Sequence, residues 1–111
     1  MRPAVIVISA ALFLASLPVQ ARGNAEKGKE LVTAKACVTC HGPTGAKPST
    51  PDQPILAGQH YDYLVQALVD YKNGRRTNPI MKGFAAQLSR KDIEDLAAWF
   101  ASQKSPLHFE R

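Results

Sequence analysis

The sequence predicts a small all-α domain, and three observations lead to that expectation. Apolar residues recur with helical spacing in three stretches, at residues 25–36, 60–73 and 90–105. Residues 42–59, which are rich in glycine and proline, are predicted to be a loop, and residues 75–84, which contain Asn78-Pro79-Ile80-Met81, are predicted to be a second loop. No stretch shows the alternation of a β-strand. The 111 residues therefore suit one domain with three main helices.

The first expected helix begins after Asn24, a residue type that favours the N-cap position. Gly28 interrupts it at a cost of about 1 kcal/mol relative to alanine, which close approach by a second helix would justify. Leu31 and Val32 continue the same face. The helix is expected to run directly into Cys37.

The second and third expected helices carry clear end signals. Gly74 closes the second helix, whose stripe holds Tyr61, Leu64, Leu68 and Tyr71. Ser89 is the expected N-cap of the third, with Asp92 completing a capping box, and Pro106 marks its end. The apolar stripe of this last helix contains Ile93, Leu96, Ala97 and Phe100, with Trp99 beside it.

Cys37 and Cys40 are the only two cysteines, and His41 follows the second of them at once. C-x-x-C-H is the attachment motif of a c-type haem. Two thiols at this spacing project to one side of a helical turn, where each can form a thioether with a haem vinyl group. The adjacent histidine can then give the iron an axial nitrogen. The sequence therefore predicts one covalent haem, with iron held on one face by His41.

Three other uses of the cysteines fit less well. A thioredoxin-like redox pair needs a βαβ setting, which the sequence lacks. A zinc site needs two further ligands at short spacing, whereas His60 and His108 are widely separated and are expected to be solvated or in the tail. A plain disulfide remains the simplest alternative, but it leaves the adjacent histidine without a role.

Iron held by one histidine needs a second axial ligand or an open position. Apart from initiator Met1, Met81 is the only methionine, and it lies in the expected loop 75–84. A core-filling role is the alternative, but a thioether ligand would favour ferrous iron and raise the potential. In the first loop, the carbonyl group of Pro54 is free to accept a bond from the other nitrogen of His41 and fix the ring.

Residues 1–21 have the layout of a cleaved secretory signal peptide. Arg2 precedes an apolar stretch over residues 4–17, and small or neutral residues lead to Ala21, the expected last residue before the cut. An uncleaved anchor is the alternative, although the stretch is shorter than the ~20 apolar residues of a membrane span. We therefore expect residues 22–111 to form the mature haem domain in the periplasm.

The charge of the chain suits a protein partner. Its formal net charge is +5, which becomes +4 without Arg2 and before the haem propionates are counted. A modest positive surface favours transient docking to acidic patches on redox proteins. Scattered basic residues disfavour nucleic-acid binding, and no general base, nucleophile or small-molecule pocket indicates an enzyme. Lys72 and Lys82 are candidates for a docking rim, whereas Arg75 and Arg76 are either solvated charges or partners of a haem propionate.

Because the domain is small, we expect the haem to contribute to its core. A domain of about 90 residues buries only about two-thirds of the surface that its unfolded chain exposes, so its core is marginal. A covalently bound apolar macrocycle would supply much of the missing interior. We expect the haem-free chain to be poorly ordered.

Six segments together resemble the class I monohaem cytochromes c. They cover the whole mature chain, and the tract from 54 to 81 is most similar to short bacterial periplasmic members, including single lobes of their two-haem relatives. These segments are the Gly28 helix, Cys37-Val38-Thr39-Cys40-His41, Pro54-Ile55-Leu56-Ala57-Gly58, the helix at 63–74, Asn78-Pro79-Ile80-Met81, and Asp95-Leu96-Ala97-Ala98-Trp99-Phe100.

The resemblance implies a cytochrome c fold and a soluble one-electron carrier that catalyses no reaction by itself. It implies that Cys37 and Cys40 bind the haem, that His41 and Met81 ligate iron, and that the Pro54 carbonyl holds His41. The alternative is the electron-accepting subunit of a larger periplasmic dehydrogenase, either a flavoprotein or an enzyme that oxidises sulfur compounds.

The resemblance also implies that Gly28 lets the first helix cross the last near Leu96 and Trp99. One departure is Val32, since many relatives carry an aromatic residue at that position, four residues after the glycine. A second haem motif is absent, so we do not expect a complete two-haem protein.

Overall fold

The structure is a computed structural model that describes residues 1–6 and 22–107. In this part of the chain there are five helices and no strand, so the predicted all-α class is confirmed. None of these helices has the length and apolar character needed to cross a bilayer. Residues 7–21, which hold most of the expected signal peptide, lie outside the described residues. The helices are α1 (Ala25–Ala34), α2 (Val38–His41), α3 (Tyr61–Lys72), α4 (Pro79–Ala86) and α5 (Arg90–Ser102).

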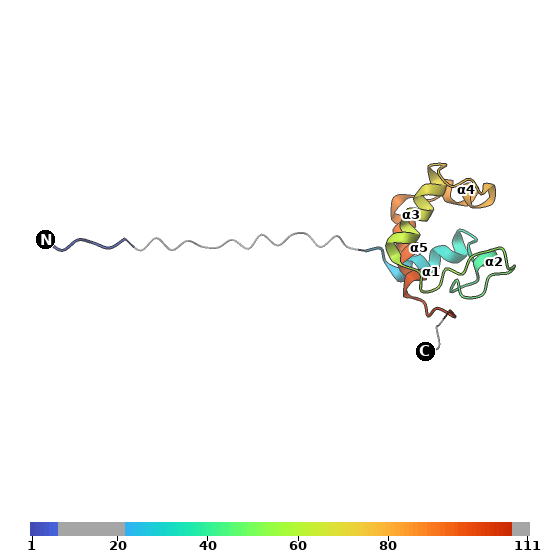
Figure 1. Ribbon diagram of the computed structural model, residues 1–111, viewed down its shortest axis with the longest axis horizontal. Helices are drawn as coiled ribbons and strands as arrows, with labels where there is room; N and C mark the ends of the chain where they lie inside the picture. Colours follow the sequence, from blue (N-terminus) through green and yellow to red (C-terminus); the bar gives the residue numbers. More distant parts are fainter. Residues whose placement is uncertain (7–21, 108–111) are drawn as a thin grey trace.

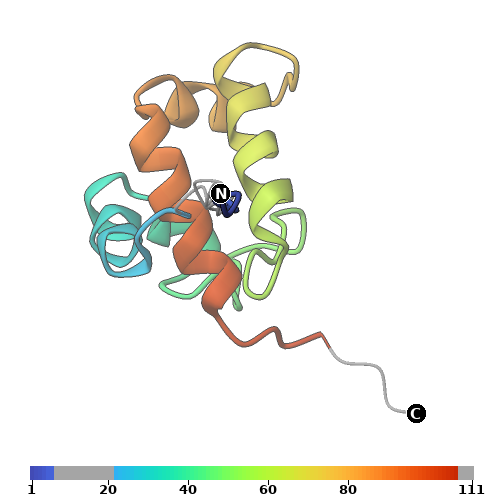
Figure 2. The same ribbon diagram turned by 90° about the vertical axis from the view of Figure 1, so that its left-hand side faces the viewer.

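Helix α5 is the centre of the arrangement, because both α1 and α3 pack against it, and α4 packs against α3. Figure 2 shows α3 and α5 running side by side. In Figure 1, α4 above and α2 below project from this pair toward the same side of the molecule. The core between the helices consists of Val32, Leu64, Val65, Leu88, Ile93, Leu96, Ala97 and Phe100. These residues come largely from the apolar stripes that the sequence predicted.

Helix α1 crosses α5 at close range because Gly28 carries no side chain. A Cβ atom on Gly28 would lie 2.0 Å from the backbone oxygen of Asp95 and 2.8 Å from the Cβ atom of Trp99. Asn24 caps α1 with its side chain, and its own N–H donates to the Asp95 carboxylate at 2.7 Å. The expected crossing is confirmed, with the backbone of Asp95 rather than Leu96 at the contact.

Asp95 is a buried carboxylate at this crossing, with 4% of its surface exposed. Burial by itself would raise its pKa. Hydrogen bonds from Lys91 and from the Asn24 N–H, with the charges of Lys91 and Lys27, outweigh burial and hold the pKa of Asp95 below its usual value. The carboxylate is therefore ionised at neutral pH and ties the start of α1 to α5.

The first helix is shorter than predicted. It ends at Ala34, and Ala36 in the following turn has a φ of 60°. A left-handed residue cannot continue a right-handed helix. Cys37 then serves as the N-cap position of α2. The C-x-x-C-H motif therefore occupies a separate short helix and not the end of the first one.

Helix α4 lies where the sequence predicted a loop, so that prediction is wrong. The side-chain oxygen of Asn78 accepts hydrogen bonds from the N–H groups of Ile80 and Met81, both at 3.1 Å. Pro79 occupies the first helical position, where a missing N–H breaks no intrahelical bond. Asparagine followed by proline is itself a helix-start signal, which the prediction of a loop over residues 75–84 did not use. Met81 therefore lies in the first turn of a helix.

The other helix ends agree closely with the prediction. Ser89 and Asp92 form the capping box of α5 through two reciprocal bonds of 3.0 Å. Helix α3 begins and ends one residue inside the predicted range 60–73, after an exposed His60 at its N-cap. Gly74, which follows its C-cap, has a φ of 79°. At these positions, the capping residues in the sequence were sufficient to predict where the helices begin and end.

Candidate haem site

A cavity of about 330 Å³ opens between α2, α3, α4, α5 and the loop that precedes α3. Its size falls in the range of about 300–1,000 Å³ that is usual for ligand sites. All five residues that the sequence assigned to the haem line this cavity, although they come from three separate segments: Cys37, Cys40, His41, Pro54 and Met81. The fold therefore brings the predicted site together.

His41 is buried, and its Nδ1 atom lies 3.1 Å from the carbonyl oxygen of Pro54. A carbonyl oxygen can only accept, so Nδ1 carries the proton and donates, which leaves the Nε2 lone pair free. Burial lowers the pKa of His41, and the hydrogen bond to Pro54 opposes that change only in part. The ring is therefore neutral at neutral pH, which is the state that binds a metal.

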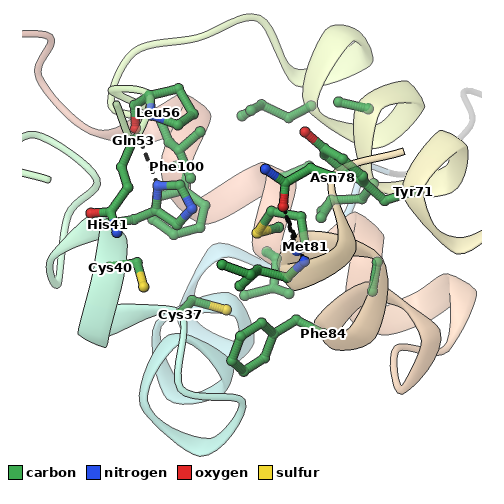
Figure 3. A pocket seen from close by; sticks show the side chains of 18 of the residues that line it. Cys37, Cys40, His41, Gln53, Leu56, Tyr71, Asn78, Met81, Phe84 and Phe100 are labelled. Carbon is green, nitrogen blue, oxygen red and sulfur yellow. Dashed lines mark hydrogen bonds between the residues drawn. The ribbon is translucent and has the colours of Figure 1, made fainter. Parts of the chain in front are cut away.

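Cys37 and Cys40 are partly buried free thiols at successive turns of the chain around α2. Figure 3 shows both sulfur atoms at the same edge of the pocket, with Cys40 next to His41. Burial raises the pKa of the Cys37 thiol, and the nearby Cys40 adds to the increase, while a backbone hydrogen bond opposes it. Their shared edge is the geometry that two thioethers to one planar ligand require.

Met81 lies across the pocket from His41 in Figure 3, with its side chain directed into the space between them. The bonds from Ile80 and Met81 to Asn78 fix the turn of α4 that carries it. An imidazole on one wall and a thioether on the other are the two axial donors of His/Met cytochromes. The structure thus places His41 and Met81 on opposite sides of one cavity, with Met81 on a helix where the sequence predicted a loop.

The rest of the wall is mostly apolar or aromatic and includes Leu56, Leu64, Leu68, Ile80, Phe84, Ala85, Leu88, Leu96, Ala97 and Phe100. Ile80 and Phe84 are large apolar side chains that are 64% and 38% exposed. Packing against an apolar macrocycle would remove such surface from water. The sequence analysis missed both residues, because their helical spacing fell in the segment assigned to a loop. The lining fits a haem.

Three other candidate residues, Lys72, Lys82 and His60, do not line the cavity. Lys72 donates from its ammonium group to the carbonyl oxygen of Leu88 and joins the end of α3 to the segment before α5. This contact gives Lys72 a structural role that the sequence did not indicate. Lys82 is exposed, His60 does not line the cavity, and His108 falls outside the described residues.

Known proteins share both the sequence pattern and the fold. The family profile described as cytochrome c matches residues 25–104. The chain belongs to the cytochrome c family. Its cofactor is accordingly a covalently bound haem c with its iron. The cavity that holds the C-x-x-C-H motif is the place in the described structure that suits this group.

Two curated relatives and one solved structure illustrate the similarity. Cytochrome c4 of Pseudomonas aeruginosa is 44% identical over 84 residues, which cover 76% of this chain and 40% of that protein. Cytochrome c-554(548) of Halomonas halodenitrificans is 35% identical over 85 residues, with 74% of this chain and 99% of that protein covered. The structure of Acidithiobacillus ferrooxidans cytochrome c4 matches with a TM-score of 0.65 at 32% identity over 77% of this chain. These matches confirm the cytochrome c fold.

A third relative carries a more specific name. The thiosulfate dehydrogenase electron acceptor of Stutzerimonas stutzeri is 32% identical over 100 residues, which cover 84% of this chain and 46% of that protein. This chain spans 52% of the A. ferrooxidans cytochrome c4 chain and less than half of both the P. aeruginosa and the S. stutzeri relatives.

Proposed function

We propose that this protein is a one-electron carrier whose covalent haem is tethered by Cys37 and Cys40 and ligated by His41 and Met81. The cavity carries the proposal, because two thiols, a neutral imidazole and a thioether line it together. The family match supports it, since the relatives include several cytochromes c.

The haem supplies a ferric/ferrous couple, and the protein controls its surroundings. The Pro54 carbonyl accepts the hydrogen bond from His41 Nδ1 and so keeps the proton there, which would leave Nε2 free to bind the iron. As a ligand, the Met81 thioether would favour the ferrous state and raise the potential. With His41 and Met81 both bound to the iron, no position would remain for dioxygen, peroxide or a substrate. This is why the proposal requires no catalytic residue.

The finer assignment is a class I monohaem cytochrome of the short bacterial type, exported to the periplasm after loss of residues 1–21. A single C-x-x-C-H motif in the sequence supports one haem per chain. The net positive charge supports brief docking to acidic patches on larger redox proteins. Nucleic acids and small-molecule substrates have no part in this proposal.

A second candidate function is a dedicated electron-accepting subunit of a larger dehydrogenase. The name of the S. stutzeri relative favours this alternative for an enzyme that oxidises sulfur compounds. Size-exclusion chromatography of the native protein from its own periplasm separates the two proposals. A free carrier elutes at the size of the domain alone, whereas a subunit co-elutes with a larger enzyme in fixed proportion.

Substitution of the proposed sixth ligand tests the carrier. Met81→Ala should keep covalent haem, lower the midpoint potential and allow carbon monoxide to bind ferrous iron at neutral pH. Ile80→Ala is the matched control, because Ile80 is a neighbour on α4 and lines the same cavity but has no donor atom. The carrier proposal is wrong if the wild-type ferrous protein binds carbon monoxide as readily as Met81→Ala does. An unchanged spectrum in Met81→Ala would reject Met81 as the ligand.

A further inference from the structure

Arg76 is held between two aromatic rings at the wall of the cavity. The central carbon of its guanidinium lies 5.6 Å from the ring centre of Tyr63 and 5.4 Å from that of Tyr71. One Nη atom also donates to the Tyr63 hydroxyl at 3.1 Å. The two tyrosines lie about two turns apart on α3, so this helix holds the guanidinium in place. All three residues line the cavity.

The neighbouring arginine is placed differently. Arg75 forms an ion pair with Asp70 at 3.5 Å and does not line the cavity. Among the described residues, no carboxylate lies within 4.0 Å of Arg76. A guanidinium has five N–H donors, and the Tyr63 hydroxyl occupies one of them. Arg76 is therefore a fixed, half-buried cation with donors left for an anion.

The chemistry of haem indicates which anion this is. The vinyl groups that form thioethers stand on two adjacent pyrrole rings, and the two propionates stand on the other two. The propionates must therefore lie away from Cys37 and Cys40. Figure 3 shows Tyr71 on the far side of the pocket from Cys40, and Arg76 stacks on Tyr71.

The other charged residues that line the cavity do not compete with Arg76 for a propionate at the end where Tyr71 lies. Lys35 also lines the cavity, but it lies two residues before the Cys37 tether. The titratable and charged groups that line the cavity besides Arg76 are Lys35, Cys37, Cys40, His41, Asp52, Tyr63 and Tyr71. Outside the cavity, Asp70 pairs with Arg75, and Lys82 lies near Gly74. Arg76 is the cation among the lining residues that the structure describes at the end opposite the cysteines.

We propose that Arg76, oriented by Tyr63 and Tyr71, binds a haem propionate and keeps that carboxylate ionised near the iron. The inference rests on the proposed function, since it requires the covalent haem. A guanidinium fork matches a carboxylate with two parallel hydrogen bonds, which an ammonium group cannot reproduce. The tyrosines hold the fork in advance, so little conformational freedom is lost when the propionate binds.

Two substitutions that remove the same charge test the proposal. Arg76→Gln and Arg75→Gln are purified as holoproteins, and the midpoint potential of each is measured from pH 5 to pH 9. A nearby cation lowers the pKa of a carboxylate by about 1–3 units. In Arg76→Gln the pH-dependent step in the potential should therefore move upward by at least about one unit. In Arg75→Gln it should stay at the wild-type position. Equal curves for the two variants would overturn the proposal.

Two further variants keep the test decisive if Arg76→Gln does not accumulate with haem. Tyr63→Phe keeps the ring but removes the hydroxyl that orients the guanidinium, and Arg76→Lys keeps the charge but removes the fork. In both variants the pH-dependent step in the midpoint potential should move upward, by a smaller amount than in Arg76→Gln. Steps at the wild-type position in both would count against the assignment.

The mass of the wild-type protein distinguishes a failure of the proposed function from a failure of the role of Arg76. If the mass shows no covalent macrocycle, the proposed function fails. If the haem and a His/Met spectrum are present but the two glutamine variants titrate alike, only the role of Arg76 fails.

Discussion

The crossing of α1 and α5 and the wall formed by α2 and α4 are built in different ways. At the crossing, Gly28 allows near-contact between backbones, and the buried Asp95 carboxylate joins the two helices. At the wall, Ile80 and Phe84 stand exposed beside a cavity of about 330 Å³. The first region is stabilised by the polypeptide alone, whereas in the second the protein leaves Ile80 and Phe84 partly exposed. A haem bound in the cavity would therefore complete the core of only one part of the domain.

The largest expected effect comes from removing the tether. Cys37→Ser together with Cys40→Ser should abolish covalent haem and lower the order of α2 and α4 more than that of α1 and α5. Hydrogen exchange resolved by segment measures this difference, and circular dichroism measures the total loss of helix. A haem-free protein that melts as cooperatively as the holoprotein would contradict the comparison. Haemochrome absorbance that survives acid–acetone extraction of the double variant would contradict the attachment site.

A pair of glycine substitutions sharpens the comparison within the holoprotein. Gly28→Ala places a methyl group 2.0 Å from a backbone oxygen, so it should destabilise the fold by about 3 kcal/mol or more. Gly83→Ala on α4 meets nothing within 4 Å and should stabilise the protein by up to about 1 kcal/mol, because alanine favours a helix. Urea unfolding of both holoproteins measures the two effects. Similar destabilisation by both would mean that α4 is packed as tightly as the crossing.

The Asp95 bonds give the crossing a dependence on pH. The folded-state pKa of Asp95 is below its unfolded value, so its contribution is present above about pH 4 and is lost as the pH falls through the folded pKa. Asp95→Asn should therefore cost about 1–3 kcal/mol at pH 7, and the cost should shrink below pH 4. Thermal melts of the holoproteins from pH 7 to pH 3 test this. Asp62→Asn, at an exposed position, is the control and should change stability much less. A cost that does not vary with pH would exclude the ionised carboxylate as the cause.

The smallest expected effect concerns the cap of α4. Asn78→Ala removes the acceptor for the Ile80 and Met81 N–H groups and should cost about 1 kcal/mol, whereas Asn78→Ser retains a capping oxygen. The looser first turn should let an external ligand such as imidazole displace Met81 about fivefold more readily from the ferric protein. Spectral titration with imidazole measures this. If Asn78→Ala and Asn78→Ser bind imidazole equally, the cap does not position Met81.

Much of the site could be predicted because its signals are covalent or local. The spacing of Cys37, Cys40 and His41 depends on the chemistry of haem attachment, which is independent of the rest of the fold. Gly28 indicated a helix crossing because a glycine inside a helix is otherwise unfavourable. The error at α4 was also local, since Asn78 and Pro79 carried a helix-start signal that was outweighed by the expectation of a loop.

The sequence by itself determined the helix faces and the C-x-x-C-H motif, and it is the source of the proposal for His41 and Met81, because each depends on residues a few positions apart. Only the tertiary structure decided that Arg76 lines the cavity whereas Arg75 does not, and that Asp95 is buried against the start of α1. Electrostatic partners are set by which element comes within about 4 Å of a charge. The Asn24–Asp95 bond joins residues 71 positions apart, so it depends on how helices distant in the chain pack together, and residue spacing does not encode it.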